Sequence, residues 1–151
     1  MNAPQPRYWR DPLFYAALVA ALVYWSLLFA LVGPRPDLTW PLREPVLFLY
    51  PALLYPVVEE LVFRGLVQEL LHRHLSPWCL GPLTHANILT SLLFTALHFI
   101  NHPPLWAAAV FAPSLVFGLL KDRSDRLAAP ILMHVFYNSG YLWLFTHGSG
   151  Q

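Results

Sequence analysis

The feature that most constrains this chain is an apolar run over residues 13–32 that contains no charged side chain. About 20 apolar residues are enough to cross the hydrocarbon core of a bilayer as one helix. The run resembles the start of a signal peptide, but it exceeds the usual apolar core of about 7 to 15 residues and no small-residue cleavage site follows it. It therefore predicts a retained transmembrane helix.

Four further apolar segments follow, at residues 46–71, 86–100, 105–120 and 127–145, with proline, glycine and charged residues between them. Charged residues make up 11% of the chain, whereas a soluble domain carries roughly a quarter. The mean hydropathy is +0.49. These values predict an all-α fold: a single membrane domain over residues 1–151, built as a polytopic transmembrane bundle of about five to six helices in the lipid bilayer.

The connecting segment at residues 33–44 is rich in proline and charge, so it is expected to be a loop outside the hydrocarbon. Within the second apolar segment, Pro51 and Pro56 are expected to kink the helix because proline cannot donate the intrahelical hydrogen bond. The segments shorter than about 20 residues require a thinned or protein-lined region of the bilayer.

The cationic residues divide unevenly between the two sides of a five-helix scheme. Two of them, Arg35 and Arg43, fall on one side, and six fall on the other: Arg7, Arg10, Arg73, Lys121, Arg123 and Arg126. Cytoplasmic loops of membrane proteins carry an excess of Lys and Arg, so the N-terminus is expected in the cytoplasm. The net charge of +1 gives no basic face for nucleic acid, which is excluded as a partner.

Charged side chains inside the second apolar segment are its most unusual feature. A charge at the centre of a membrane helix costs about 2.5 to 3.5 kcal/mol on insertion scales, so function is the expected reason for it. Glu60 and Arg64 are four residues apart, the spacing at which opposite charges on a helix meet. Glu59 has no such local partner. A desolvated, unpaired carboxylate suits a general base.

Two later segments contribute further polar groups. His98 ends the otherwise apolar sequence from Phe94, and its neutral imidazole can hold a water molecule inside a membrane. His134 and Asn138 lie one helical turn apart on one face, where both can donate hydrogen bonds to one oxygen. An acid, two histidines and an amide on three helices have the parts for hydrolysis: a base, a partner that holds water, and oxyanion donors.

These residues also carry a family resemblance. Residues 59–64 are similar to the EExxxR motif of the CPBP family, residues 94–98 to its FxxxH motif and residues 134–138 to its HxxxN motif. That family comprises CAAX prenyl proteases of the Rce1 type and bacteriocin-processing or Abi-type membrane proteins. The resemblance covers about residues 46–141, which would form the catalytic core. It is specific because the three motifs occur in the same order and on apolar helices.

The resemblance implies a glutamic intramembrane protease. Glu59 and His98 would activate the hydrolytic water, and His134 and Asn138 would form the oxyanion hole. Glu60 and Arg64 match the supporting acid and arginine of the first motif. No cofactor or metal is implied. The expected partner is a peptide or protein cut near the membrane, in a leader peptide, a C-terminal sorting signal or a CAAX-like tail. The expected location is a bacterial inner membrane.

Three alternatives compete with this interpretation. Glu59, His98 and His134 could supply three ligands of a zinc peptidase with an open position for water, although no HExxH helix is present. A non-catalytic immunity or scaffold protein of the same fold could bind a peptide without cutting it. A proton-coupled transporter would use intramembrane acids and histidines, but it would be expected to show a repeat or paired interrupted helices, and the sequence has neither.

Overall fold

The computed structural model describes residues 7–34, 37–75 and 77–146, so Arg35 of the predicted outer loop lies outside the described residues. Apart from one short hairpin, the described elements are helical: η1 (Tyr8–Arg10), α1 (Pro12–Val32), α2 (Trp40–Arg43), α3 (Pro45–Leu49), η2 (Tyr50–Leu54), α4 (Tyr55–Glu60), η3 (Leu61–Gln68), α5 (Glu69–His74), α6 (His85–His98), α7 (Pro104–Ala109), α8 (Phe111–Ser124) and α9 (Ala128–Phe145).

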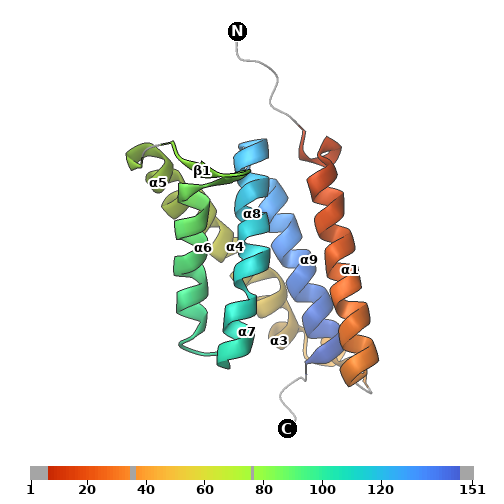
Figure 1. Ribbon diagram of the computed structural model, residues 1–151. Helices are drawn as coiled ribbons and strands as arrows, with labels where there is room; N and C mark the ends of the chain where they lie inside the picture. The colour runs from red at the N-terminus through yellow and green to blue at the C-terminus, as the bar shows by residue number, and fades with distance from the viewer. Residues whose placement is uncertain (1–6, 35–36, 76, 147–151) are drawn as a thin grey trace.

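These elements join into five rods that lie side by side as a bundle (Figure 1). The elements from α3 to α5 make one continuous 30-residue helix, and α7 with α8 makes one of 21 residues. These two helices and α1 are long and apolar enough to cross a membrane. The other two rods are α6 and α9, and both carry predicted site residues. The prediction of an all-α membrane bundle is confirmed.

The connections between the rods contain more regular structure than expected. The segment predicted as a loop includes the short helix α2, which is held against the end of α9 because the Trp40 indole donates to the Trp143 carbonyl at 3.2 Å. Between α5 and α6, strands β1 (Cys79–Leu80) and β2 (Leu83–Thr84) form a small antiparallel hairpin. Gly81 has a φ of 60° in its turn, a conformation in which glycine avoids the strain of a side chain.

Pro51 and Pro56 lie in the second rod, the continuous helix over residues 45–74, and coincide with a change of helical pitch. Residues 50–54 form the π-helical segment η2, where Tyr55 donates its backbone N–H to the Tyr50 carbonyl five positions earlier. In this wider register, the Pro51 carbonyl would pair with residue 56, which is a proline and has no N–H. The Pro51 carbonyl is therefore free to accept a bond from another helix. A second π-helical segment, η3, carries Arg64.

Helix α1 packs against α8 and α9 through a small apolar cluster that includes Ala17, Phe117 and Met133. The Tyr137 hydroxyl donates to the Ala17 carbonyl at 2.8 Å. Further along, the Trp25 indole lies so close to Gly140 that a Cβ at Gly140 would overlap it. The close approach of α1 to α9 thus depends on the absence of a side chain at that glycine.

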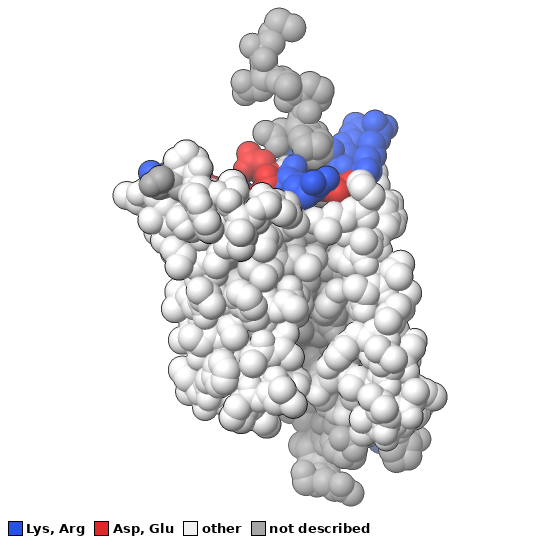
Figure 2. Space-filling view, viewed as in Figure 1, with Lys and Arg blue, Asp and Glu red and all other residues white. Residues whose placement is uncertain are grey.

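Charged side chains gather at one end of the bundle, at the top of Figure 2. Helix α1 begins at this end and α8 finishes there (Figure 1). We call it the cationic end, defined by Arg7, Arg10, Arg73, Lys121, Arg123 and Arg126. The opposite end, which we call the far end, contains α2, the 99–103 connection between α6 and α7, and the end of α9.

Candidate active site

The predicted ion pair between Glu60 and Arg64 is present and fully buried. Arg64 Nη1 donates to Glu60 Oε1 at 2.9 Å, and both side chains are 0% exposed. Arg64 Nη2 also donates to the Ser114 hydroxyl at 2.7 Å and to the Ser114 carbonyl at 2.9 Å. A buried charge pair gains stability when hydrogen bonds satisfy its remaining donors, and Ser114 on α8 does so for Arg64 Nη2, whereas Arg64 Nε and Glu60 Oε2 are buried without a hydrogen-bond partner.

Arg64 belongs to a row of polar contacts between the second rod and α8. Gln68 donates to the Gly118 carbonyl at 3.1 Å and to Asp122 Oδ1 at 2.6 Å. Arg64–Ser114, Gln68–Gly118 and His72–Asp122 are each separated by 50 positions, which means that the two helices run in the same direction.

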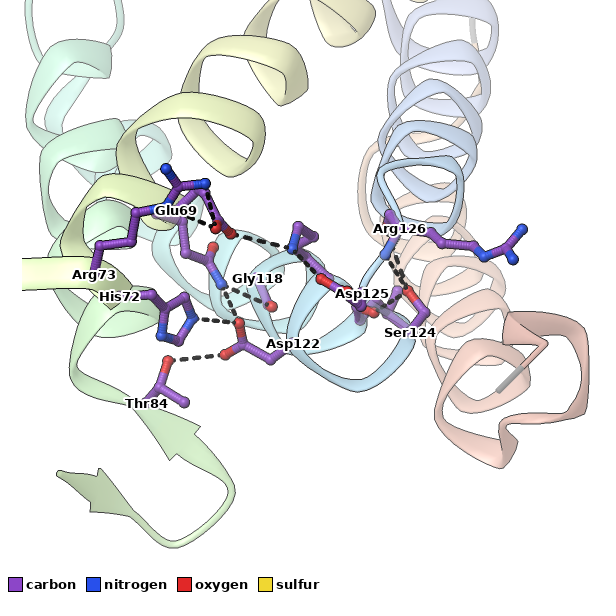
Figure 3. Close-up of polar contacts among 12 residues, drawn as sticks. Glu69, His72, Arg73, Thr84, Gly118, Asp122, Ser124, Asp125 and Arg126 are labelled. Atoms are coloured by element: carbon purple, nitrogen blue, oxygen red, sulfur yellow. Dashed lines mark hydrogen bonds and ion pairs between the residues drawn. The ribbon is translucent and has the colours of Figure 1, made fainter. Parts of the chain in front are cut away.

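The row ends at the cationic end, where Asp122 accepts hydrogen bonds from three elements (Figure 3). Besides Gln68, its partners are His72 Nε2 at 2.8 Å and the Thr84 hydroxyl, also at 2.8 Å. Asp122 therefore ties α5, β2 and α8 together beside the charged surface. In the sequence, this row corresponds to polar residues at every fourth position: Glu60, Arg64, Gln68 and His72. Our prediction used only the first two of them.

His134 on α9 lies between the two adjacent glutamates. Its Nδ1 is 2.8 Å from Glu60 Oε1, and its Nε2 is 3.6 Å from Glu59 Oε2. Because Glu60 is ion-paired with Arg64 and can only accept, His134 Nδ1 must carry the proton in that bond. Glu59 has no cationic neighbour on its own helix, but in the folded bundle the imidazole of His134 lies beside it.

Glu59 and Glu60 differ in solvent exposure although they are neighbours in the chain. The Glu59 side chain is 33% exposed, whereas that of Glu60 is 0% exposed. Successive residues of a helix point about 100 degrees apart, so one acid faces the ion pair inside the bundle and the other reaches the edge of the site.

His98 is oriented by its own helix. Its Nδ1 lies 2.8 Å from the Phe94 carbonyl, which can only accept, so Nδ1 carries a proton and Nε2 has the free lone pair of a neutral ring. The Phe94 ring lies 4.4 Å from the His98 ring and 5.9 Å from the His134 ring, measured between centroids. Phe94 therefore packs against both imidazoles.

His102 is a further polar residue of the candidate site, and it lies next to His98. Its ring stacks on His98 with centroids 5.6 Å apart and lies tilted against Trp106 with centroids 4.2 Å apart. His102 is exposed, and it is near enough to Glu59 for the two to interact electrostatically. Partial burial and the neighbouring His98 hold the pKa of His102 below its usual value. It lies in the loop after α6.

Asn138 is fixed by the second rod rather than by another site residue. Its Nδ2 donates at 3.1 Å to the Pro51 carbonyl, the acceptor that the π-helical segment and Pro56 leave without a backbone partner. An amide nitrogen has two N–H groups, so one donor of Asn138 is left for another acceptor.

The structure thus brings four of the six predicted residues into direct contact: Glu59, Glu60, Arg64 and His134. Within the described residues, no hydrogen bond or ion pair connects His98 or Asn138 to these four. Ser114, which holds the guanidinium of Arg64, was missed. Its signal was a hydroxyl in the middle of the apolar segment at residues 105–120.

The zinc alternative required three converging ligands. Over the ranges that the structure describes, no group of three His, Cys, Asp or Glu side chains could hold one metal ion. Glu59, His98 and His134 therefore do not form a ligand set in this arrangement.

The fold and these contacts define a membrane helix bundle with an acid and imidazole cluster inside it. A family model described as type II CAAX prenyl endopeptidase Rce1-like matches residues 41–140. The chain belongs to this family, and at the level of the family it is an integral membrane peptidase. The match agrees with the resemblance seen over residues 46–141. A search of curated proteins found no match, and neither did a search of solved structures.

Proposed function

We propose that the protein is an intramembrane endopeptidase of the glutamic type, which hydrolyses a peptide bond by water activated between Glu59 and His98. The observation that carries the proposal is the position of His134 between Glu60 and Glu59, at 2.8 Å and 3.6 Å. An acid at the edge of the site stands beside an imidazole that a second, buried acid orients. Peptide hydrolysis needs a base close to a hydrogen-bond donor that is held in a fixed orientation. Here Glu59 would be the base and His134 the donor.

In the proposed reaction, Glu59 accepts a proton as the water oxygen bonds to the peptide carbonyl carbon. The lone pair on His98 Nε2 holds the same water, because its Nδ1–H is engaged by the Phe94 carbonyl. The carbonyl oxygen becomes an oxyanion. When the C–N bond breaks, the carbonyl is restored as a carboxyl group, and the leaving nitrogen takes the proton from Glu59.

His134 Nε2 and the second N–H of Asn138 are the proposed donors to the oxyanion. His134 donates from both nitrogens only as an imidazolium. Ionised Glu59 and Glu60 would then balance Arg64 and His134, so the cluster would have no net charge inside the membrane. Proton transfer to Glu59 adds one positive charge, which the oxyanion cancels.

The proposed substrate is a protein or peptide with a cleavage site near the membrane: a leader peptide, a C-terminal sorting signal or a CAAX-like tail. The proposed location is a bacterial inner membrane. We include neither a metal nor a cofactor in the proposal.

The test is a comparison of peptides from a deletion strain that expresses the wild type or Glu59→Gln. Peptides that depend on the wild type should be absent with Glu59→Gln although the variant accumulates in the membrane. Glu69→Gln is the matched control, because Glu69 is an acid on the same rod that pairs with Arg73 at the surface. Normal cleavage by Glu59→Gln would refute the assignment of the base.

A second arm addresses the two alternatives. Membranes washed with a chelator should keep their cleavage activity, and a loss that Zn²⁺ restores would favour the metallopeptidase. No difference between the deletion strain and the wild type would favour the non-catalytic scaffold.

A further inference from the structure

The cations of the cationic end fall into two groups according to their acidic partners. Arg73 and Lys121 lie on the side of α5, with side-chain nitrogens 3.1 and 3.7 Å from carboxylate oxygens of Glu69. Lys121 also pairs with Asp125 at 3.1 Å. Acids therefore match the cations of this first group, and little net charge remains on that side of the bundle.

The second group has a surplus of positive charge, and we call it the arginine corner. It lies where α1 begins and where α8 passes into α9, and its members are exposed: Arg7, Arg10, Arg123 and Arg126. Figure 2 shows Lys and Arg side chains gathered over this part of the bundle. Asp11 accepts two hydrogen bonds from Arg123, at 2.5 and 3.0 Å. Within the described ranges, no hydrogen bond or ion pair engages the guanidinium groups of the other three arginines.

The tertiary fold holds the arginine corner together. The ion pair of Asp11 and Arg123 joins segments that are 112 positions apart in the chain. Arg10 directly precedes Asp11. Arg126 follows Arg123 by three positions, so it also remains near the ion pair. Tyr8 packs against the apolar cluster between α1, α8 and α9, which fixes η1 on the bundle. The guanidinium groups are therefore gathered before any ligand binds.

The arginine corner lies at the level of the lipid headgroups. Helix α1, which is long and apolar enough to cross a membrane, starts at Pro12, two residues after Arg10. Next to this start, Trp9 and Tyr15 are 46% and 52% exposed, and the Tyr15 hydroxyl donates to the Trp9 carbonyl at 2.8 Å. Tryptophan and tyrosine are enriched at the membrane–water interface, because their rings are apolar at one end and polar at the other. Lipid headgroups are therefore the molecules nearest to the unpaired arginines.

We propose that the arginine corner binds the phosphate headgroup of an anionic phospholipid. A planar guanidinium group can donate two parallel hydrogen bonds to the oxygens of one phosphate. Basic side chains beside a membrane helix attract lipids that carry a net negative charge. A zwitterionic headgroup carries a cationic group as well, which the surplus of positive charge at the corner repels. Lipid binding here requires neither the proposed hydrolysis nor the assignment of the cationic end to one side of the membrane.

Native mass spectrometry of the full-length protein in a neutral detergent measures this binding, during titration with phosphatidylglycerol or with phosphatidylcholine. The wild type should bind phosphatidylglycerol more tightly. The double variant Arg10→Gln with Arg126→Gln should lose this preference, because a basic side chain near an anionic surface contributes about fivefold to binding, or about 25-fold for two. Equal affinity of the wild type for the two lipids would overturn the proposal.

Arg73→Gln is the matched control, because Arg73 is an exposed arginine of the same end that has Glu69 as its partner. This variant should bind phosphatidylglycerol as the wild type does. An equal loss in Arg73→Gln and in the double variant would assign the binding to the diffuse charge of the whole end, and it would overturn the arginine corner as the site.

Inorganic phosphate distinguishes a lipid from a free anion. It should not displace an equal concentration of phosphatidylglycerol, because the acyl chains also cover apolar side chains of α1 such as Val19 and Leu22, which are 56% and 51% exposed. Displacement would assign the corner to free phosphate and overturn the lipid. Thermal unfolding without anionic lipid should be the same for the wild type and the double variant. If the double variant is less stable, Arg126→Gln alone provides the same test, with an expected loss of about fivefold.

Discussion

His134 Nδ1 and Arg64 Nη1 both donate to the same carboxylate oxygen, Oε1 of Glu60, at 2.8 and 2.9 Å. Glu60 therefore connects the ion pair on the second rod to the imidazole on α9. Because the pair is fully buried, the contact with Glu60 rather than with solvent orients His134.

The first prediction compares the two adjacent acids. Glu60→Gln leaves Arg64 as a buried, unpaired charge, and removal of one partner of a buried ion pair costs about 3 to 5 kcal/mol. Glu59→Gln removes a 33% exposed acid and should leave stability unchanged or slightly higher. Thermal unfolding of both variants in detergent measures the difference. Equal midpoints for the two variants would contradict the structural role of Glu60.

The second prediction concerns Gly118, where α8 meets α6. A Cβ at this position would overlap the Asn87 side chain, which donates to the Leu115 carbonyl and accepts from Ser91. Gly118→Ala should destabilise the bundle by about 1 to 3 kcal/mol, the usual cost of overpacking. The double variant Gly118→Ala with Asn87→Ala should recover part of this loss in the same unfolding assay. Complete tolerance of Gly118→Ala alone would show that the contact is loose.

The third prediction concerns the docking of α1, which lies outside the matched residues 41–140. Gly140→Ala would force the Trp25 indole away and should weaken the contact of α1 with α9, again by about 1 to 3 kcal/mol. Susceptibility of the α1–α2 connection to protease measures that contact. Combination with Trp25→Ala should restore close approach. The ion pair of Glu60 and Arg64 should be unaffected in both variants.

The fourth prediction is a pH dependence at the cationic end. Arg123 donates two hydrogen bonds to Asp11, at 2.5 and 3.0 Å, and these bonds hold the pKa of the Asp11 carboxyl below its usual value. The stabilisation should be fully present above the ordinary aspartate pKa of about 3.9 and lost as the pH falls through the lowered value. Because the Arg123 side chain is 48% exposed and water screens its charge, we expect about 1 kcal/mol or less.

Asp11→Asn isolates this effect, because asparagine can still accept the bond from the Leu13 N–H that caps α1. The wild type should unfold at a higher temperature than Asp11→Asn at neutral pH, and the difference should vanish in acid. A difference that persists below the lowered pKa would assign it to something other than the charge of Asp11.

Local sequence was sufficient for much of this protein. The apolar runs predicted the helices because burial in lipid requires each rod to satisfy its own backbone hydrogen bonds. The spacing of Glu60 and Arg64 predicted their ion pair because residues four apart on a helix face each other. The three motifs indicated the family before any contact was known. The hairpin at residues 79–84 and helix α2 were missed, since both are short and depend on neighbouring elements.

The contacts between distant segments came from the packing of the bundle alone. The sequence did not indicate that the Pro51 carbonyl would accept from Asn138, that Ser114 would hold Arg64, or that His134 would stand between two glutamates. These contacts join residues 50 to 87 positions apart, and the periodicity of one helix contains no information about the face of another. The order of residues along the chain was enough to show which polar side chains lie inside the membrane. Packing determined which of them meet, because side chains on separate rods come together only when the bundle closes.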